Sequence, residues 1–437
     1  MSSKDLPWDR LATTDQTGRR IYLYPSEVRG RWKDRRSKLS IGLILLFLGL
    51  PWVRVGGHQS ILLDVPNRNF SILGLTFWAH DAPLLFFIFG GSVILIAFIT
   101  AIWGRVWCGW ACPQTVFVEQ VYRRVEYWIE GDALTRRRMD EGPLNLNKVK
   151  RKAMKWAIFS TTSLVLSHSF LAYFIGTEEL GRMMARSPFQ NPVPFLIMAG
   201  IAGLILFDFG WFREQFCTVV CPYGRFQSVL MDDHSSVIAY DSKRGEPRKG
   251  TAAEGVPTGD CVNCYRCVQV CPTGIDIRRG VQLECVACTS CIDACDDVMG
   301  RLKKPLGLIR YGNQAMADGK EQTSTPWFKR TRAWIYLIVL VSCISGLTYT
   351  IIHRSPIELT LIRAVDFPYQ EIQSEGIPKV INHFKVDLRN QTFENQEILF
   401  NLSSAYRDQG FTLIVSNHKS SLAAGESERA DLFLQFP

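Results

Sequence analysis

The chain has 437 residues, enough for more than one domain, with 47% hydrophobic residues and a formal net charge of +9. The apolar residues gather in long uncharged blocks, which argues against a soluble enzyme, because core helices rarely lack charge over so many residues. Five blocks are predicted to be membrane-spanning helices, and the first of them is short. In chain order they are Leu39–Val53, Leu84–Trp103, Trp156–Phe174, Pro194–Trp211 and Ala333–Ile352.

Lysine and arginine are unevenly distributed among the segments between these blocks. Residues 1–38 carry ten, residues 104–155 eleven and residues 213–332 seventeen, whereas the loops 54–82 and 176–193 carry two each. Because basic segments stay on the cytoplasmic side, this pattern predicts a cytoplasmic N-terminus and a tail on the outer side. The basic runs RGRWKDRR and TRRRM abut membrane segments and lack aromatic stacking residues. We therefore expect them to attract anionic membrane lipid and no nucleic acid.

The spans and their connections predict a mainly α-helical membrane protein with five parts. These are a cytoplasmic arm (1–38), a four-helix membrane region (39–212), a cytoplasmic insert (213–332), a fifth transmembrane helix (333–353) and an outer tail (354–437). The tail contains four short, partly alternating segments, FKVDLRN, EILFNLS, FTLIVS and DLFLQF, separated by turn residues. Such segments are typical of β-strands, so we expect a small β-sandwich there.

Eight cysteines of the insert form two runs with the same spacing, C-x2-C-x2-C-x3-C. The first run is Cys261, Cys264, Cys267 and Cys271, and the second is Cys285, Cys288, Cys291 and Cys295. On the predicted cytoplasmic side, a reducing environment favours metal thiolates over disulfides. The spacing is that of bacterial two-cluster ferredoxins, in which the fourth cysteine of each run ligates the other cluster. Only the first run ends in the usual proline, since Asp296 follows the second.

The runs therefore predict two [4Fe–4S] clusters with crossed ligand sets. The first cysteine set is Cys261, Cys264, Cys267 and Cys295, and the second cysteine set is Cys271, Cys285, Cys288 and Cys291. A zinc site would usually use more widely separated C-x2-C pairs, and inert cysteines would have no reason to repeat the spacing. Two neighbouring clusters conduct single electrons, so we expect the insert to transfer electrons and not to carry out bond chemistry.

A second pair of motifs lies at the ends of spans two and four, in RVWCGWACPQ and EQFCTVVCPY. Cys108 and Cys217 are 109 residues apart, as are Cys112 and Cys221, which indicates duplication of a two-helix unit. Cysteines at i and i+4 share one face of a helix, and the proline suits a helix end or restart. Four thiols could thus meet at one membrane depth, where soft thiolates favour Cu(I). The alternatives are a disulfide/dithiol couple and ordinary packing of buried cysteines.

Two polar residues inside the predicted spans are weaker candidates for a functional role. Asp208 in span four is either functional or paired with Arg213 or Arg105, because intramembrane carboxylates are rarely left alone. His168 in span three could face a quinone or a haem, although a single histidine is more often a packing residue.

The segments WCGWACPQTVF, REQFCTVVCPYGRFQ, GDCVNCYRCVQVCPTGIDIR and LECVACTSCIDACD together resemble a known family. It is the family of cytochrome c oxidase accessory proteins called CcoG, also FixG or RdxA, which are membrane-bound polyferredoxins. The likeness runs from about residue 20 to the end and includes DVPNRNFSILGLTFW and LIRYGNQ. In combination these motifs are specific, whereas the ferredoxin run alone would not be.

The resemblance implies a multi-pass protein of the bacterial inner membrane with a cytoplasmic ferredoxin domain and a periplasmic immunoglobulin-like tail. It implies a cupric reductase, an oxidoreductase that converts Cu(II) to Cu(I) for assembly of cbb-type cytochrome c oxidase. Copper binding would fall on Cys108, Cys112, Cys217 and Cys221, and cluster ligation on the two cysteine sets. The implied partners are a cytoplasmic electron donor of unknown identity, a copper carrier or transporter, oxidase assembly factors and, as a possible arrangement, a second copy of the chain.

Two other functions are compatible with the same motifs. A quinol-linked electron-transfer subunit that feeds a periplasmic nitrate or nitrous oxide reductase would share both C-x3-C-P motifs and the two-cluster insert. Such subunits commonly lack a β-rich domain after a fifth span, whereas this sequence predicts one. An assembly scaffold with structural clusters is the third hypothesis, and redox titration of the clusters would distinguish it.

Overall fold

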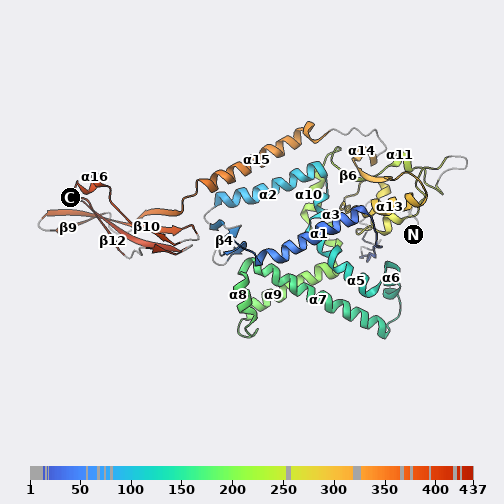
Figure 1. Cartoon of the computed structure of the whole chain (residues 1–437), viewed down its shortest axis with the longest axis horizontal. Coiled ribbons are helices and arrows are strands. Elements are labelled where there is room, and N and C mark those ends of the chain that lie inside the picture. Colours follow the sequence, from blue (N-terminus) through green and yellow to red (C-terminus); the bar gives the residue numbers. More distant parts are fainter. Residues whose placement is uncertain are drawn as a thin grey trace. The chain divides into compact units, whose positions relative to one another are not determined.

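The computed structural model describes residues 13–14, 17, 19–55, 58–65, 69–72, 75–78, 82–251, 257–317, 326–364, 369–374, 377–392, 395–416, 421–423 and 426–436 (Figure 1). Contacts between residues divide the chain into two compact units. The first unit comprises Met1–Pro51 and Phe86–Ile344, and the second comprises Trp52–Leu85 and Ser345–Pro437. Every cysteine therefore belongs to the first unit, and the β-rich tail belongs to the second.

Helices dominate the first unit, where long apolar helices alternate with short polar ones. The α-helices up to Leu230 are α1 (Arg31–Gly49), α2 (Ala82–Trp103), α3 (Val106–Trp110), α4 (Pro113–Phe117), α5 (Arg123–Glu130), α6 (Ala133–Glu141), α7 (Leu146–Ile175), α8 (Thr177–Met184), α9 (Pro192–Ile205) and α10 (Pro222–Leu230). Three π-helical segments interrupt them, η2 (Val118–Tyr122), η3 (Leu206–Phe212) and η4 (Phe216–Val220). The rest are α11 (Ser242–Gly245), α12 (Arg266–Gln269), α13 (Ser290–Arg301), α14 (Gln314–Ala317) and α15 (Thr331–Ile352), with the 3-10 turns η1 (Leu50–Trp52), η5 (Ile277–Arg279) and η6 (Trp327–Lys329).

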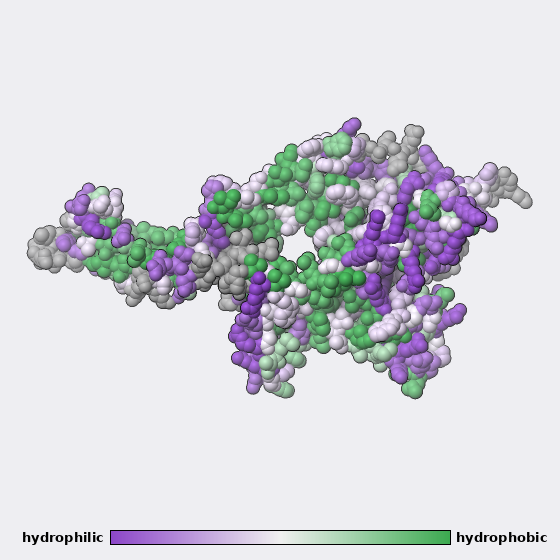
Figure 2. All heavy atoms as spheres, in the orientation of Figure 1, coloured by the Kyte–Doolittle hydropathy of each residue, from purple (hydrophilic) through white to green (hydrophobic). Residues whose placement is uncertain are grey.

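Four helical segments are long and apolar enough to cross a membrane. They are Leu84–Trp103, Leu146–Ile175, Pro192–Phe212 and Thr331–Ile352. Between none and a third of each apolar stretch is buried inside the structure, so most of this hydrophobic surface is exposed. In Figure 2 the side chains over α2 and α15 are mostly hydrophobic, whereas hydrophilic side chains cover much of the insert. Such extensive exposed apolar surface indicates burial in lipid.

The short first block differs from these four helices. It forms the second half of α1, whose first two turns contain the charged run from Arg31 to Lys38. The apolar part that begins at Leu39 is shorter than about 17 residues, the usual minimum for a membrane span. A fifth span at this position therefore remains a prediction.

The charged half of α1 contacts the insert on one side. The backbone N–H groups of Trp32 and Lys33 donate to the carboxylate of Asp293 on α13, at 3.2 and 2.7 Å. Asp293 thus satisfies the unpaired N–H groups at the start of a helix that lies 260 residues earlier in the chain. The buried Arg36 donates to the carbonyl oxygen of Cys288 at 2.6 Å. The N-terminal arm and the insert are consequently parts of one packed body.

Two strands complete the insert, β6 (Val237–Tyr240) and β7 (Ile309–Gly312), which pair antiparallel. Their side chains join a core that contains cysteines of both runs. In the second unit, short strands occupy the outer loop. They are β1 (Arg54–Val55), β2 (His58–Gln59), β3 (Ile61–Asp64), β4 (Asn69–Ile72) and β5 (Leu75–Trp78).

The tail forms an antiparallel sheet of five strands in the order β12-β14-β10-β8, with β9 also paired to β10. The strands are β8 (Ile357–Arg363), β9 (Gln370–Ser374), β10 (Ile377–Asn390), β12 (Thr412–Ser416) and β14 (Ser427–Phe436); β11 (Gln396–Glu397) pairs with β13 (Ser421–Leu422), and α16 covers Ser404–Arg407. Val386 and Leu388 of the sheet pack against Ile398 and Leu422. Of the four expected strands, three are present, while EILFNLS forms a strand only at its first residue, in β11, because Ile398 and Phe400 fold over the core as a loop.

Candidate functional site

The two ferredoxin runs fold as two copies of the same loop. Asn263 and Tyr265 in the first run have left-handed backbone angles, with φ of 56° each. Ala287 and Thr289, at the matching places of the second run, have φ of 53° and 65°. Residues other than glycine seldom adopt this conformation. Its occurrence at the same two places of both runs indicates that the two loops share one specific backbone structure. A short helix, α12 or α13, begins directly after each loop.

The second cysteine set lies around one small cavity. Cys271, Cys285, Cys288 and Cys291 line it, together with Cys267 and apolar side chains. Burial raises the pKa of the Cys291 thiol, and the neighbouring Cys288, Cys285 and Cys271 raise it further. Four buried or half-buried thiols this close together, none in a disulfide, fit a [4Fe–4S] cluster, which keeps thiolates charged by binding them to iron.

The first cysteine set lies close together in the same way. Burial raises the pKa of Cys295 to about 12, with Asp296, Cys261 and Cys264 as further causes. Burial also raises the pKa of Cys267 to about 12, and Cys295 and Cys264 are among the charges that act on it. The fourth cysteine of the second run is therefore near the first three of the first run.

Each C-x3-C-P motif breaks the helix at its second cysteine. Cys112 and Cys221 have extended backbones, with φ/ψ of −61°/126° and −69°/111°, and the following proline begins α4 or α10. In both copies the N–H of this cysteine donates to the carbonyl oxygen five residues earlier, at 2.9 Å for Cys112 and 2.8 Å for Cys221. The shared geometry supports duplication of the motif. The proline restarts a helix, as expected, but the second cysteine of each motif lies at the break and not on the helical face of the first.

The four thiols of these motifs share one neighbourhood. Burial is the main cause that raises the pKa of Cys108 to about 11, and the neighbouring Cys112 and Cys221 contribute to this value. Burial also raises the pKa of Cys217, on which Cys112, Cys108 and Cys221 all act. Within the described part of the chain, no three His, Cys, Asp or Glu side chains converge tightly enough to enclose one ion. The thiols are therefore neighbours whose side chains would have to rotate to close around a metal.

Polar side chains not singled out by the sequence analysis surround these thiols. The fully buried Gln227 of α10 donates its side-chain N–H to Cys108 Sγ at 2.8 Å. Gln114 of α4 donates to Asp208 Oδ1 at 3.1 Å. Gln227 closes the segment REQFCTVVCPYGRFQ, so proximity to the motif is the signal that could have identified it.

Of the two alternatives for Asp208, a functional role or an ion pair with Arg213 or Arg105, the structure does not show the ion pair. Arg213 pairs with Glu126 at 2.7 Å, and Arg105 donates to backbone carbonyl groups. Besides burial, the negative charge of Asp208 instead helps to raise the pKa values of the Cys217 and Cys112 thiols. Its carboxylate accordingly belongs to the surroundings of the thiols.

The helix that carries Cys108 packs directly on the loop between Cys285 and Cys288. A β-carbon built on Gly109 would lie 2.5 Å from the carbonyl oxygen of Val286 and 2.7 Å from that of Ala287, too close for any side chain. Arg105 also ties this junction together, because it donates to the carbonyl oxygens of Leu283, Cys285 and Gly224. The backbone of the first C-x3-C-P motif thus contacts the backbone of the loop between Cys285 and Cys288, which are two members of the second cysteine set.

A network of buried ions holds α5 beside this junction. Glu126, which is 1% exposed, accepts from Arg213 at 2.7 and 3.0 Å and from Arg136 at 3.0 Å. Lys155 of α7 approaches the same carboxylate at 3.5 Å. Burial alone would raise the pKa of Glu126, but these cations outweigh it and lower the pKa to about 2.

We expect this network to make the protein sensitive to acid. A carboxylate whose pKa is lowered on folding stabilises the fold above its unfolded pKa, which is near 4.5, and this stabilisation is lost as the pH falls towards 2. Tryptophan fluorescence of the detergent-solubilised protein, followed from pH 6 to pH 2.5, should therefore show unfolding below pH 4.5. A Glu126→Gln variant should show a flatter acid profile, and an unchanged profile would contradict the role of Glu126.

His168 lines a mostly apolar cavity that none of the C-x3-C-P cysteines lines. Its Nδ1 is 2.7 Å from the carbonyl oxygen of Leu164, one turn earlier in α7. Met183, Met184 and Met198 line the same cavity. This bond to its own helix accounts for one ring nitrogen, and no second histidine lines the cavity.

Comparisons with known proteins match three parts of the chain. A 4Fe-4S dicluster domain matches residues 212–314, a 4Fe-4S binding domain matches residues 82–135, and the Ig-like fold at the C-terminus of FixG matches residues 347–437. The chain is 33% identical to nitrogen fixation protein FixG of Rhizobium meliloti over 424 residues, 87% of this chain and 79% of that protein. It is 31% identical to protein RdxA of Cereibacter sphaeroides, over 86% of this chain and 81% of that protein. Ferredoxin-type protein NapH of Haemophilus influenzae is more distant, at 24% identity over 60% of this chain and 85% of that protein. No solved structure matches.

The paired cysteine loops and the dicluster match define an iron–sulfur electron-transfer protein of the ferredoxin type. Its four apolar helices and its relatives indicate that it is a membrane protein. The chain belongs to the FixG/RdxA family, as the sequence motifs predicted, and its tail is the Ig-like domain of that family.

Proposed function

We propose that this protein passes single electrons to copper and reduces Cu(II) to Cu(I) at the C-x3-C-P thiols. Cys108, Cys112, Cys217 and Cys221 would bind the copper, since soft thiolates prefer Cu(I) over the harder Cu(II). The observation that carries the proposal is the backbone contact of Gly109 with the Val286–Ala287 loop, which places these thiols beside the second cysteine set.

The remaining assignments belong to the same proposal. The two cysteine sets would hold two [4Fe–4S] clusters, which supply one-electron transfer when bound. Gln227 would orient the Cys108 thiol, and Asp208 would favour a cation among the thiols. The cluster segment would face the cytoplasm and the Ig-like tail the periplasm, because the basic loops favour this orientation. Reduced copper would pass to a copper carrier or transporter for assembly of cbb-type oxidase.

The test is copper reduction by the purified, anaerobically reduced protein. A Cys108→Ala/Cys217→Ala variant should form Cu(I), measured with a Cu(I)-specific chelator, at least about tenfold more slowly than the wild type. Cys343→Ala is the matched control, because this thiol lies on α15, away from both motifs in the chain. Equal rates for the double variant and the wild type would disprove the thiol assignment.

Iron content and quinol oxidation separate the competing functions. Eight iron atoms per chain are expected from two clusters. The 4Fe-4S binding domain matched to residues 82–135 favours a second candidate, in which the four C-x3-C-P thiols hold a third cluster. That candidate requires twelve iron atoms. Reduction of the clusters by quinol, without any reduction of copper, would instead support a quinol-linked electron-transfer subunit.

A further inference from the structure

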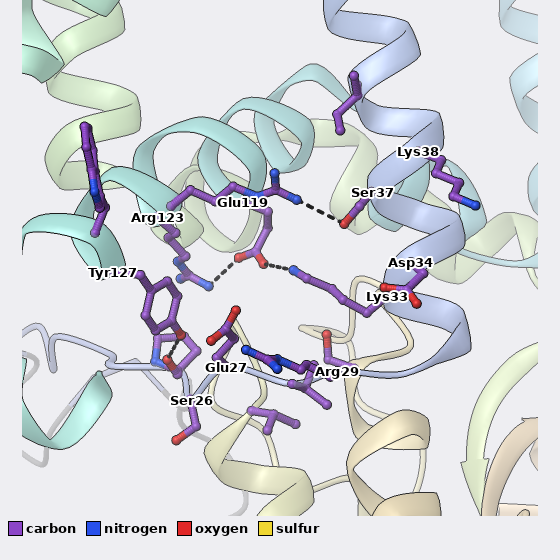
Figure 3. Close-up of a pocket in the computed structure, with 17 residues that line it drawn as sticks. Ser26, Glu27, Arg29, Lys33, Asp34, Ser37, Lys38, Glu119, Arg123 and Tyr127 are labelled. Atoms are coloured by element: carbon purple, nitrogen blue, oxygen red, sulfur yellow. Dashed lines mark hydrogen bonds and ion pairs between the residues drawn. The ribbon is translucent and has the colours of Figure 1, made fainter. Parts of the chain in front are cut away.

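An open cavity of about 690 Å³ lies where the N-terminal arm, α1 and α5 meet the cluster-binding segment (Figure 3). Its walls come from residues 25–29, from α1, from the helical turns of η2 and α5, and from Val270 and Ser290 of the insert. The volume is in the range of pockets for small molecules and cofactors.

Positive charge predominates in this cavity. Five cations and three carboxylates line it. Lys33 and Arg123 are held by Glu119, as Figure 3 shows, which neutralises part of this charge. The other two carboxylates, Glu27 and Asp34, are exposed.

Three cations of the cavity are available to a ligand. Within the part of the chain that the structure describes, Arg29 and Lys38 have no ion-pair partner, and Arg124 donates only to Ser37 Oγ at 3.4 Å. All three side chains are exposed and come from three different segments. Arginine and lysine arranged in this way are typical of phosphate recognition.

The floor of the cavity adjoins the second cysteine set. Val270 and Ser290 are 3% and 5% exposed, and the next residues in the chain are Cys271 and Cys291. Two members of the set therefore directly follow, in the chain, residues that line the cavity. Apolar contacts are also available, because Ile41, Tyr127 and Trp128 line the cavity and Trp128 is 82% exposed.

We propose that this cavity binds reduced flavin mononucleotide and is the entry point for electrons. The ligand combines the two features that the cavity selects, a phosphate for the free cations and a flat aromatic ring for the apolar wall. A flavin can also release its electron pair one electron at a time, as single-electron acceptors require. The redox part of this inference rests on the proposed cluster assignment.

The electrons and protons of this step balance. Reduced flavin mononucleotide gives up two electrons and two protons and becomes the oxidised flavin. Each of the two clusters accepts one electron, and the protons pass to solvent through the open side of the cavity. Two Cu(II) ions can then be reduced for each flavin oxidised.

The first test measures binding alone, from the quenching of flavin fluorescence by the cluster-loaded protein in detergent. An Arg29→Ala/Arg124→Ala variant should bind oxidised flavin mononucleotide at least about tenfold more weakly, because it loses two charge-assisted contacts to the phosphate. Binding of riboflavin, which lacks the phosphate, should change less than twofold. The control variant Arg138→Ala removes an exposed arginine of α6 that does not line the cavity, and it should bind like the wild type. Iron content shows that each variant is folded and loaded.

The second test follows bleaching of cluster absorbance by reduced flavin mononucleotide. It should be slower in the double variant, whereas bleaching by dithionite should be unchanged. Equal binding of both flavins by wild type and variant would overturn the proposal. So would binding in which the two arginines matter for nanodiscs of phosphatidylglycerol but not for the flavin, because the cavity would then hold a lipid headgroup. If the flavin tests fail but the dithionite-reduced protein still reduces copper normally, only this inference has failed and the proposed function stands.

Discussion

A Gly109→Val variant should retain both clusters and yet reduce copper about a hundredfold more slowly. Two backbone carbonyl oxygens lie within 3 Å of the place where its β-carbon would be, and backbone cannot move aside as a flexible side chain can. The loop between Cys285 and Cys288 must therefore move away from α3. Displacements of about 1 Å at a reacting centre commonly cost a factor of this size.

The measurement is anaerobic stopped-flow reduction of Cu(II), with iron content determined on the same samples. Gly181→Val is the matched control, because a β-carbon at Gly181 on α8 meets no atom within 4 Å. If Gly109→Val kept its iron and reduced copper at the wild-type rate, this contact would not be the route to the thiols. Loss of iron would mean that the loop between Cys285 and Cys288 needs this contact to bind its cluster, and not only to lie close to the thiols.

Among variants with one substitution near the site, Glu126→Gln should have the lowest free energy of unfolding. Arg213 and Arg136 are 2% and 1% exposed, and both lose their charged partner at once. Breaking a buried ion pair on one side costs about 3–5 kcal/mol, because the remaining charges are left without compensation. The free energy of unfolding should fall by about this amount.

Thermal unfolding in detergent, followed by tryptophan fluorescence, provides the measurement. The control is Glu141→Gln, which removes an exposed i,i+4 pair with Arg137 on α6 and should leave the melting temperature unchanged. Equal melting temperatures for Glu126→Gln and the wild type would show that the network does not stabilise the fold.

Features set by local spacing could be predicted from the sequence. Cysteine spacing indicated the two-cluster segment and the duplicated motif, and uncharged length indicated the four long helices. The proline of each motif indicated a helix end or restart, but the sequence did not show that the break falls at Cys112 and Cys221 themselves. That position depends on the hydrogen bond from each cysteine N–H to the carbonyl oxygen five residues earlier.

Contacts between distant segments could not be predicted in this way. Arg213 follows Asp208 by only five residues in the sequence, yet it pairs with Glu126, 87 residues away. Nothing in the local pattern of Glu126 distinguishes it from an exposed helical glutamate, because its burial depends on how α5, α7 and the arm pack. Gly109 likewise looks like an ordinary glycine until the loop that it meets is seen.

The bond of Asp293 to the first turn of α1 has a consequence for how the molecule is made. The ribosome releases the arm early, but the residue that caps its helix is synthesised 260 positions later. Until then the first turn of α1 lacks this cap, although Lys33 and Arg36 can already pair with Glu119, which is made much earlier. Maturation would finish only when the newly made iron–sulfur segment folds back onto the oldest part of the chain.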